Sequence, residues 1–224
     1  ESNDDRYIIA GYPWFKCRAR DTFISLPGLT LSIEEDDYFE LVMKTAMKGY
    51  YEFMEGKPVT VHIAEIDQPD VPLWAVWALQ QYAKEKGKEA CLKKYGKFIK
   101  DVVMYVKCNH HPNLKLMPNG LLYTDGKDKA VTWMNSTANG HPVVPRTGYI
   151  VEFNALWYNA LCFCASLCEL AGKEKDQQQF LEAAELAKQS FLDTFLNEYG
   201  YLYDYVDGKM IDWSVRPNMI FPVA

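Results

Sequence analysis

Residues 131–161 read VTWMNSTANGHPVVPRTGYIVEFNALWYNAL, and the rest of the chain is organised around this stretch. Its first half is rich in glycine, proline and polar side chains, which is typical of a surface loop rather than of a core. Its second half, from Glu152 onward, has the apolar spacing of a helix. The side chains in this stretch that present polar groups or flat aromatic rings are Trp133, Asn135, His141, Arg146 and Glu152.

These residue types favour a binding site for a neutral, hydroxyl-rich ring. Hydroxyl groups pair with carboxylates, amides and guanidinium groups, and the C–H face of a sugar packs on an indole. The alternative interpretation is a loop whose polar groups satisfy one another above a helical core. Residue types alone leave both interpretations open.

The length and composition indicate a folded domain with a substantial core. The chain has 224 residues, 49% of them hydrophobic, so it forms one domain or a piece of a larger one and is not disordered. A net charge of -6 with scattered basic residues argues against a nucleic-acid partner. The lysines of Lys88–Lys100 are the exception, and their spacing indicates the solvent-facing side of an amphipathic helix.

The sequence has no strong targeting or metal-binding signal. No apolar run approaches a membrane span, and the acidic residues 1–5 do not resemble a signal peptide, so a cytoplasmic location is expected if this is the native start. The six cysteines do not form a disulfide framework, and those at 162, 164 and 168 match no zinc signature. His110 and His111 lack a second group of ligands. We therefore expect no metal, no organic cofactor and no membrane partner.

Apolar spacing predicts a series of helices separated by loops. The clearest helix runs from Glu34 to Glu55, with Gly56 and Pro58 ending it. Further helices are predicted at residues 73–82, 88–108, 152–171 and 176–196, and Pro27-Gly28 is expected to kink or interrupt an apolar stretch over residues 23–31. Helix pairs packed side by side would place the polar loops on one rim. The sequence therefore predicts an all-α layered fold with a polar end.

Short strands are expected in the connecting segments. The connection over residues 109–151 is long for a helical domain, and such connections are usually functional. It is predicted to hold strands at residues 120–123 and 130–133, joined through a hairpin turn at Asp125-Gly126. Residues 7–10 also have the composition of a strand, and residues 201–208 that of a strand and a turn.

Polar residues ahead of two predicted helices have structural as well as functional interpretations. Arg20 and Asp21 precede an apolar helix, where the helix dipole favours an acidic residue. Asp70 is placed to cap a helix that has Pro72 in its first turn. Trp74 shares a helix face with Trp77, which is also consistent with a place in the core.

Five ordered groups of residues together resemble a known family. They are GYPWF at 11–15 with RDT at 20–22 and ISLPGL at 24–29, DVPLW at 70–74, TWM at 132–134, PRTG at 145–148 with VEFNALWYNAL at 151–161, and RPN at 216–218. They are similar to motifs of the amylo-α-1,6-glucosidase module of glycogen debranching enzymes. The match runs from residue 7 to the last residue, and five motifs in order are far more specific than any one.

The resemblance implies a fold and a reaction. The fold is an (α/α)6 toroid of the glucoamylase-like six-hairpin type, with the site where the connecting loops gather. The reaction is exo-acting hydrolysis, with inversion, of the α-1,6-linked glucose at a glycogen branch point. In that chemistry a carboxylic acid protonates the glycosidic oxygen, and a carboxylate about 6.5–9.5 Å away activates water. The implied partner is an α-glucan such as glycogen, a limit dextrin or a maltooligosaccharide.

The resemblance also implies roles for individual residues. Arg20 and Asp21 would hold the hydroxyl groups of the terminal glucose, and Glu152 would contact the substrate or take part in catalysis. One glucose-sized hollow at one end of the ring is expected to be surrounded by Arg20, Asp21, Asp70, Trp133, Arg146 and Glu152. The implied stacking walls are Trp14, Trp74 and Trp133, and the other implied substrate contacts are Asp70, Arg146 and Asn218.

One departure from the family pattern concerns the general acid. Where the family has Thr-Trp-Met-Asp, with that aspartate as the general acid, this chain has Asn135. An amide has no proton to give at neutral pH, so the acid step fails here or moves to Asp125, Asp128 or Glu152. An engineered substitution that traps substrate is another explanation. Met219, where the family usually has glutamine, is a lesser mismatch.

The second departure is length. The chain holds about six predicted helices where a closed ring needs about twelve. Residues 1–224 are therefore expected to form a partial catalytic domain that is inactive alone, with the general base beyond Ala224. Half a ring would expose apolar faces and allow self-association. The competing hypotheses are a glucan-binding module that has lost its acid and a helical scaffold whose tryptophans are all in the core.

Overall fold

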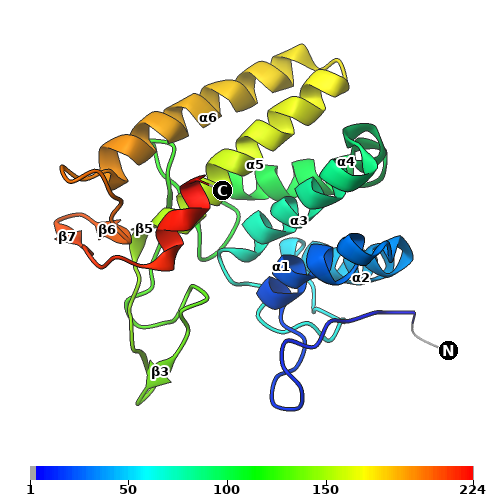
Figure 1. Ribbon diagram of the computed structural model, residues 1–224, viewed down its shortest axis with the longest axis horizontal. Helices are drawn as coiled ribbons and strands as arrows, with labels where there is room; N and C mark the ends of the chain where they lie inside the picture. Colours follow the sequence, from blue (N-terminus) through cyan, green and yellow to red (C-terminus); the bar gives the residue numbers. More distant parts are fainter. Residues whose placement is uncertain (1–3, 224) are drawn as a thin grey trace. The chain divides into compact units, whose positions relative to one another are not determined.

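The computed structural model describes residues 4–223. The chain divides into two compact units, residues 1–102 and 103–224. Helices make up most of the regular structure, and the strands are short (Figure 1). This confirms a mainly helical fold with short hairpins in its connections, while the (α/α)6 ring and the single partial domain stay predictions. Within residues 4–223, the helices are all too short or too polar to cross a membrane.

The first unit is built from helices. Its elements are α1 (Ala19–Leu29), the 3-10 turn η1 (Leu31–Ile33), α2 (Asp36–Met54), α3 (Val71–Lys86) and the larger part of α4 (Lys88–Lys107). α1 packs against both α2 and α3. The helices predicted from apolar spacing are confirmed here. α3 begins directly after Asp70, as the predicted cap requires, and ends later than expected.

Interlocking aromatic rings join α2, α3 and α4 in the core of the first unit. Phe39 of α2 stacks on Tyr82 of α3 with their centroids 5.1 Å apart, and Tyr95 of α4 meets Tyr82 edge-on, also at 5.1 Å. All three side chains are buried. Such pairs contribute about 0.5–1.5 kcal/mol beyond the area they bury. The helical spacing of these residues thus fixes which faces of the helices meet.

Two local predictions for the first unit are wrong. Pro27 does not interrupt α1, because it lies in the last turn, where its missing N–H removes a single helical bond and its ring is buried. Residues 7–10 do not form a strand. The backbone there bonds within its own loop, through Ala10 N–H to the carbonyl of Lys16 at 3.2 Å, rather than to a neighbouring strand.

The second unit combines a helical hairpin with an antiparallel sheet. The helices are α5 (Val151–Leu170) and α6 (Glu174–Phe195), which pack closely on each other. The sheet has the order β1 (Lys115–Leu116), β2 (Leu122–Thr124), β5 (Gly148–Ile150), β6 (Tyr205–Asp207) and β7 (Met210–Ile211). A separate pair consists of β3 (Thr137–Ala138) and β4 (His141–Pro142), and the 3-10 segment η2 (Pro217–Val223) follows β7. Leu121, Val151, Phe195 and Val206 form a core cluster between these elements.

The predicted hairpin between residues 120–123 and 130–133 is wrong. β2 pairs instead with β1, through Leu116 and Leu122, and with β5, through Tyr123 and Tyr149. Residues 130–133 are not in a strand. Residues 125 and 126 are not in a turn. The Gly126 backbone instead passes so close to the Arg146 carbonyl that a Cβ would lie 1.9 Å from that oxygen.

The junction between β5 and α5 positions the residues described below. Gly148 has a φ of +86°, and a Cβ on it would lie 2.3 Å from the carbonyl oxygen of Val206, so only glycine fits there. β5 then runs beside β6, with Ile150 opposite Tyr205, and passes directly into α5 at Val151. This short, direct connection places residue 146 before β5 and residue 152 in the first turn of α5, both near the start of β6.

Candidate functional site

A buried ionic network lies where β5, α5 and β6 meet in the second unit. The Arg146 guanidinium donates to both carboxylate oxygens of Glu152, through Nη1 to Oε1 and through Nη2 to Oε2 at 2.6 Å. It also donates to both carboxylate oxygens of Asp204, through Nε at 2.7 Å and Nη2 at 2.9 Å. All three side chains are almost completely buried. One arginine thus holds two acidic residues that are far apart in the sequence.

Asp204 is the centre of this network. In addition to the bonds from Arg146, its Oδ2 accepts a bond from Arg216 Nη1 at 2.7 Å, and its Oδ1 accepts one from Asn218 Nδ2 at 2.7 Å. Arg216 Nη1 also donates to Asp212 at 3.0 Å. A buried carboxylate held by two guanidinium groups has its charge compensated, which is the condition for burying it at all.

The network ends at an aromatic ring that reaches the surface. The side-chain oxygen of buried Asn218 accepts a bond from Trp133 Nε1 at 2.8 Å, while its nitrogen donates to Asp204. Trp133 itself is 47% exposed. The bond to Asn218 fixes the direction in which the indole points, so a flat apolar surface is held in place by buried ions beneath it.

The electrostatics of the Arg146–Glu152 pair reflect its burial. Burial raises the pKa of the Glu152 carboxyl, and the bonds and charge of Arg146 oppose that rise. Burial alone would lower the pKa of Arg146, but Glu152 and Asp204 raise it on balance. Because both Glu152 oxygens accept bonds from Arg146, the geometry suits Glu152 to orienting the guanidinium rather than to transferring a proton.

A second, smaller cluster lies in the first unit, at the beginnings of α1 and α3. Arg20 donates to both oxygens of Asp70, through Nε at 2.5 Å and Nη2 at 2.9 Å, and Trp74 Nε1 donates to Asp70 Oδ2 at 3.2 Å. All three side chains are buried. Asp70 stands at the N-cap position, as expected, but its side chain makes no capping bond to the helix backbone. It is used instead to hold Arg20 and Trp74.

The other predicted site residues are more exposed. Trp14 is 83% exposed, on a loop closed by a 2.7 Å bond from Phe15 N–H to the Gly11 carbonyl. Asp21 is half-buried in the first turn of α1. Asn135 is exposed in the loop between Trp133 and β3. The alternative acids Asp125 and Asp128 are also exposed.

The structure thus groups the predicted residues within each unit. Trp133, Arg146, Glu152 and Asn218 belong to one bonded network, and Arg20, Asp70 and Trp74 to another. Their gathering around a single hollow stays a prediction. Among the described residues, no three His, Cys, Asp or Glu side chains are grouped as the ligands of a metal would be.

Two members of the larger network were not among the predicted site residues. The sequence predictions place Asp204 in a strand-and-turn segment and Arg216 in a motif, and give neither side chain a role. The signal for Asp204 was an acidic residue flanked by tyrosines in an apolar strand-like run, because a carboxylate buried there requires a cation. Arg216 lies two residues before Asn218, so it was the nearest candidate in the sequence.

A comparison with protein families assigns the chain. Residues 1–224 match the family described as Amylo-alpha-1,6-glucosidase. The chain belongs to this family. The amylo-alpha-1,6-glucosidase family is a part of glycogen debranching enzyme, a glycoside hydrolase, and its substrates are α-glucans. A search of curated proteins gave no match.

Membership of the amylo-alpha-1,6-glucosidase family gives the two clusters a context. In a family whose substrates are neutral sugars, buried ion pairs are not needed to neutralise a charged substrate. Their common feature here is that each holds a tryptophan by its indole N–H, Trp133 through Asn218 and Trp74 through Asp70. Asn135 lies two residues after Trp133 in the same loop, and its place at the general-acid position stays a prediction.

Proposed function

We propose that the chain binds the α-1,6-linked glucose at a glycogen branch point and that the chemistry of its site is hydrolysis with inversion. The observation that supports this most strongly is the bonded series from Glu152 through Arg146, Asp204 and Asn218 to the indole of Trp133. Each member fixes the next, and only the last presents a large surface to solvent.

Such an arrangement suits a sugar because recognition needs a rigid aromatic face. A glucose ring packs its C–H face on an indole, and the gain is largest where the indole does not have to be ordered on binding. The bond from Trp133 to Asn218 removes that cost beforehand. We assign Arg146 and Glu152 to holding this geometry, and Trp133 to direct contact with the substrate.

In the first unit, we assign substrate contact to Asp21 and Trp14. Arg20 and Asp70 bond each other inside the protein, so their role is to fix the turn from which Asp21 projects. Asp21 is half-buried next to Arg20, and its carboxylate can accept hydrogen bonds from sugar hydroxyl groups. Trp14 is the most exposed of the three tryptophans assigned to stacking.

The acid step is where this chain departs from the proposed reaction. Inverting hydrolysis needs a carboxylic acid to protonate the glycosidic oxygen and a carboxylate to activate water. Asn135 takes the place of the acid, and its amide cannot give a proton at neutral pH. Glu152 is a poor substitute because Arg146 occupies both its oxygens. The second candidate function, favoured by Asn135, is therefore a glucan-binding module that no longer turns over its substrate.

Restoring the acid separates these two functions. The experiment compares the full-length protein with its Asn135→Asp variant for release of glucose from a limit dextrin, and measures maltooligosaccharide affinity separately. Enzyme chemistry predicts release by Asn135→Asp and little or none by the parent. Asn139→Asp is the matched control, since it adds the same charge to another exposed asparagine of this loop.

The outcomes distinguish the hypotheses. If both proteins bind maltooligosaccharides and neither releases glucose, the hydrolytic function is wrong for this chain and the binding module stands. If neither protein binds an α-glucan, the proposed function fails in both forms. Release by Asn139→Asp would show that added charge, rather than the position of the acid, restores activity.

A further inference from the structure

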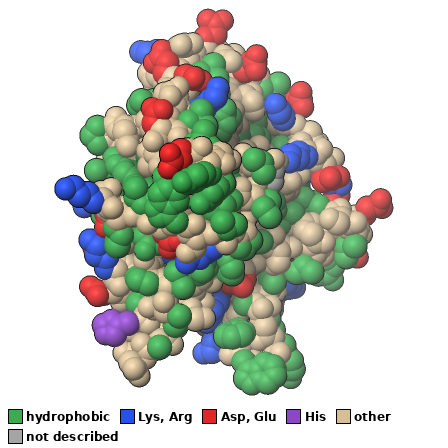
Figure 2. Space-filling model, turned by 60° about the vertical axis from the view of Figure 1, so that its left-hand side comes forward, with side chains coloured by type: hydrophobic (Ala, Val, Ile, Leu, Met, Phe, Trp, Pro, Cys, Tyr) green, Lys and Arg blue, Asp and Glu red, His purple; other side chains and the backbone are tan. Residues whose placement is uncertain are grey.

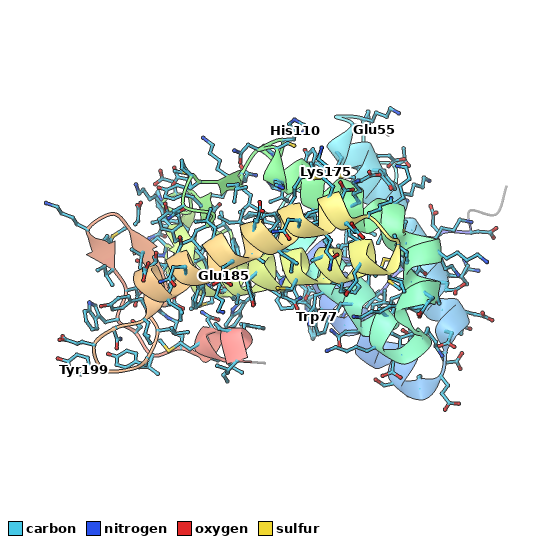
Figure 3. The ribbon with its side chains drawn as sticks, turned by 90° about the horizontal axis from the view of Figure 1, so that it is seen from above. Glu55, Trp77, His110, Lys175, Glu185 and Tyr199 are labelled. Carbon is cyan, nitrogen blue, oxygen red and sulfur yellow. The ribbon has the colours of Figure 1, made fainter. Side chains whose placement is uncertain are left out.

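The second unit carries a partly exposed aromatic cluster that the proposed function does not use. It consists of Tyr199, Tyr201, Tyr203 and Trp213, which we call the aromatic platform. Tyr199 is 71% exposed and Trp213 is 45% exposed. Figure 2 turns forward the side of the molecule that carries β6 and β7, and hydrophobic side chains gather there between charged ones. Figure 3 shows Tyr199 on the loop after α6, away from the helical hairpin.

The rings of the platform touch in a continuous series. Tyr199 and Tyr201 are nearly parallel, with an interplanar angle of 19° and centroids 6.4 Å apart. Trp213 meets Tyr199 edge-on at 6.4 Å and Tyr203 edge-on at 4.6 Å. Two segments separated by a strand pair therefore contribute to one surface. Exposed aromatic groups in contact are a typical mark of an interaction site on a soluble protein.

The backbone beneath the platform is held by side chains. The side-chain oxygen of buried Asn197 accepts bonds from the N–H groups of Tyr199 at 2.9 Å and Tyr201 at 3.3 Å. On the other segment, Asp212 accepts a bond from Ser214 N–H at 2.7 Å, which encloses Trp213 in a turn. Turns bonded in this way keep the rings in place before any ligand arrives, so binding costs little conformational entropy.

The platform is also joined to the network that holds Trp133. Asp212 accepts a bond from Arg216, and the same Arg216 nitrogen donates to Asp204. The backbone repeats this link, because Asp204 N–H bonds the Asp212 carbonyl and Asp212 N–H bonds the Tyr205 carbonyl, both at 3.0 Å. The chain thus builds the platform and the ring of Trp133 on one rigid frame.

We propose that the aromatic platform binds a stretch of α-glucan chain, as a contact additional to the glucose held at Trp133. Tyrosine and tryptophan each combine an apolar face with a polar tip, which matches a ligand with alternating C–H faces and hydroxyl groups. The ionic groups that hold the turn, Asp212 and Arg216, bond each other, which favours a neutral ligand over an ionic one. The proposal rests on the proposed function, because it takes its ligand class from the family's substrate.

The test measures the affinity of the 224-residue chain for maltoheptaose by calorimetry and for glycogen by affinity electrophoresis. Tyr199→Ala and Trp213→Ala are each expected to weaken binding about two- to tenfold, from the 0.5–1.5 kcal/mol that an aromatic contact contributes. Trp213→Phe should retain most of the affinity, because it keeps a ring. Tyr38→Ala is the matched control, since Tyr38 is an exposed tyrosine of α2 outside the platform.

The result expected is weaker binding in the platform variants with no change in Tyr38→Ala. Unchanged affinity in Tyr199→Ala overturns the proposal, and this variant cannot fail merely by unfolding because its ring is mostly in solvent.

Trp133→Ala distinguishes the two proposals: if it alone lowers affinity, the platform is wrong and the proposed function stands. If only the platform variants lower affinity, the platform stands and the role of Trp133 is wrong. A parent dimer that Trp213→Ala dissociates, with glucan affinity unchanged, would assign the surface to a second copy of the chain and overturn the proposal.

Discussion

At the scale of single residues, the buried network of the second unit depends on one carboxylate, which accepts bonds from three side chains. Asp204 is fully buried and receives bonds from Arg146, Arg216 and Asn218. Without it, two arginines would face each other and the amide of Asn218 would lose the partner that orients it toward Trp133. Stability and the geometry of the candidate site therefore depend on the same atoms.

Removing that charge should be costly. Asp204→Asn is expected to lower the free energy of unfolding by about 3–5 kcal/mol, because it leaves buried guanidinium groups without their counter-charge. Urea denaturation followed by circular dichroism measures the change. Asp193→Asn is the control: this exposed aspartate of α6 accepts a bond from Gln189, and its substitution should cost no more than about 0.5 kcal/mol. A loss below about 1 kcal/mol for Asp204→Asn would mean that the network is solvated rather than buried.

The same residues show what could be recognised from the sequence. Trp133, Arg146 and Glu152 could be recognised because they lie close together in one loop and the start of the following helix. Polar side chains there that make no local backbone bond are candidates for a site. Asp204 did not, because its main partner is 58 positions away and its burial is a consequence of strand pairing. Asp70 was correctly placed ahead of a helix, but the bond that explains it comes from Arg20, 50 positions away. Local sequence indicates which residues need partners, and tertiary structure decides which partners they find.

At the scale of elements, the helices were predictable, whereas the predicted strands at 120–123 and 201–208 only overlap β2 and β6 and the pairing of β2 was not predicted. The predicted helices at 88–108 and 152–171 agree with α4 and α5 within one residue at each end, because a 3.6-residue period repeats over several turns. The strands have only two or three residues each, too few for any period to show. β5 lies between β2 and β6, so its neighbours come from either side in the sequence and no local turn identifies them.

The junction between β5 and α5 is sensitive to the addition of a single methyl group. Gly148→Ala is expected to destabilise the protein by about 1–3 kcal/mol or more, because alanine is strained at a φ of +86° and its Cβ would clash with the backbone at Val206. Gly28→Ala is the matched control. Gly28 lies in α1 with nothing within 4 Å of the added Cβ, so alanine should be neutral or stabilising by up to about 1 kcal/mol. Thermal unfolding of both variants checks this, and equal effects would show that the close approach at Gly148 does not exist in solution.

At the scale of the whole chain, the features assigned to substrate, apart from Asp21, share one chemical character. Trp14, Trp133 and the aromatic platform all present aromatic surface to solvent. In the two bonded clusters, by contrast, acidic side chains are paired with arginines inside the protein. An anionic ligand would find few free cations at these places, and the net charge of -6 would repel it. A neutral polysaccharide meets neither obstacle, which agrees with the α-glucan substrates of the family.

A ligand that binds only the folded chain must raise its unfolding temperature, and the size of the rise depends on the affinity. At a concentration 100 times its Kd, maltoheptaose is expected to stabilise the protein by about 2.7 kcal/mol. For a chain of this size each 1 kcal/mol corresponds to about 2–4 °C, so differential scanning calorimetry should show a rise of about 5–11 °C. Cellohexaose, with the same glucose units in β-linkage, should give a much smaller rise if recognition follows the linkage of the family's substrate. Because the chain has two compact units, the melt will resolve two transitions if the units unfold separately. A sugar-dependent shift confined to one transition would then identify the unit that holds the glucan, and equal shifts with both sugars would contradict specificity for α-glucans.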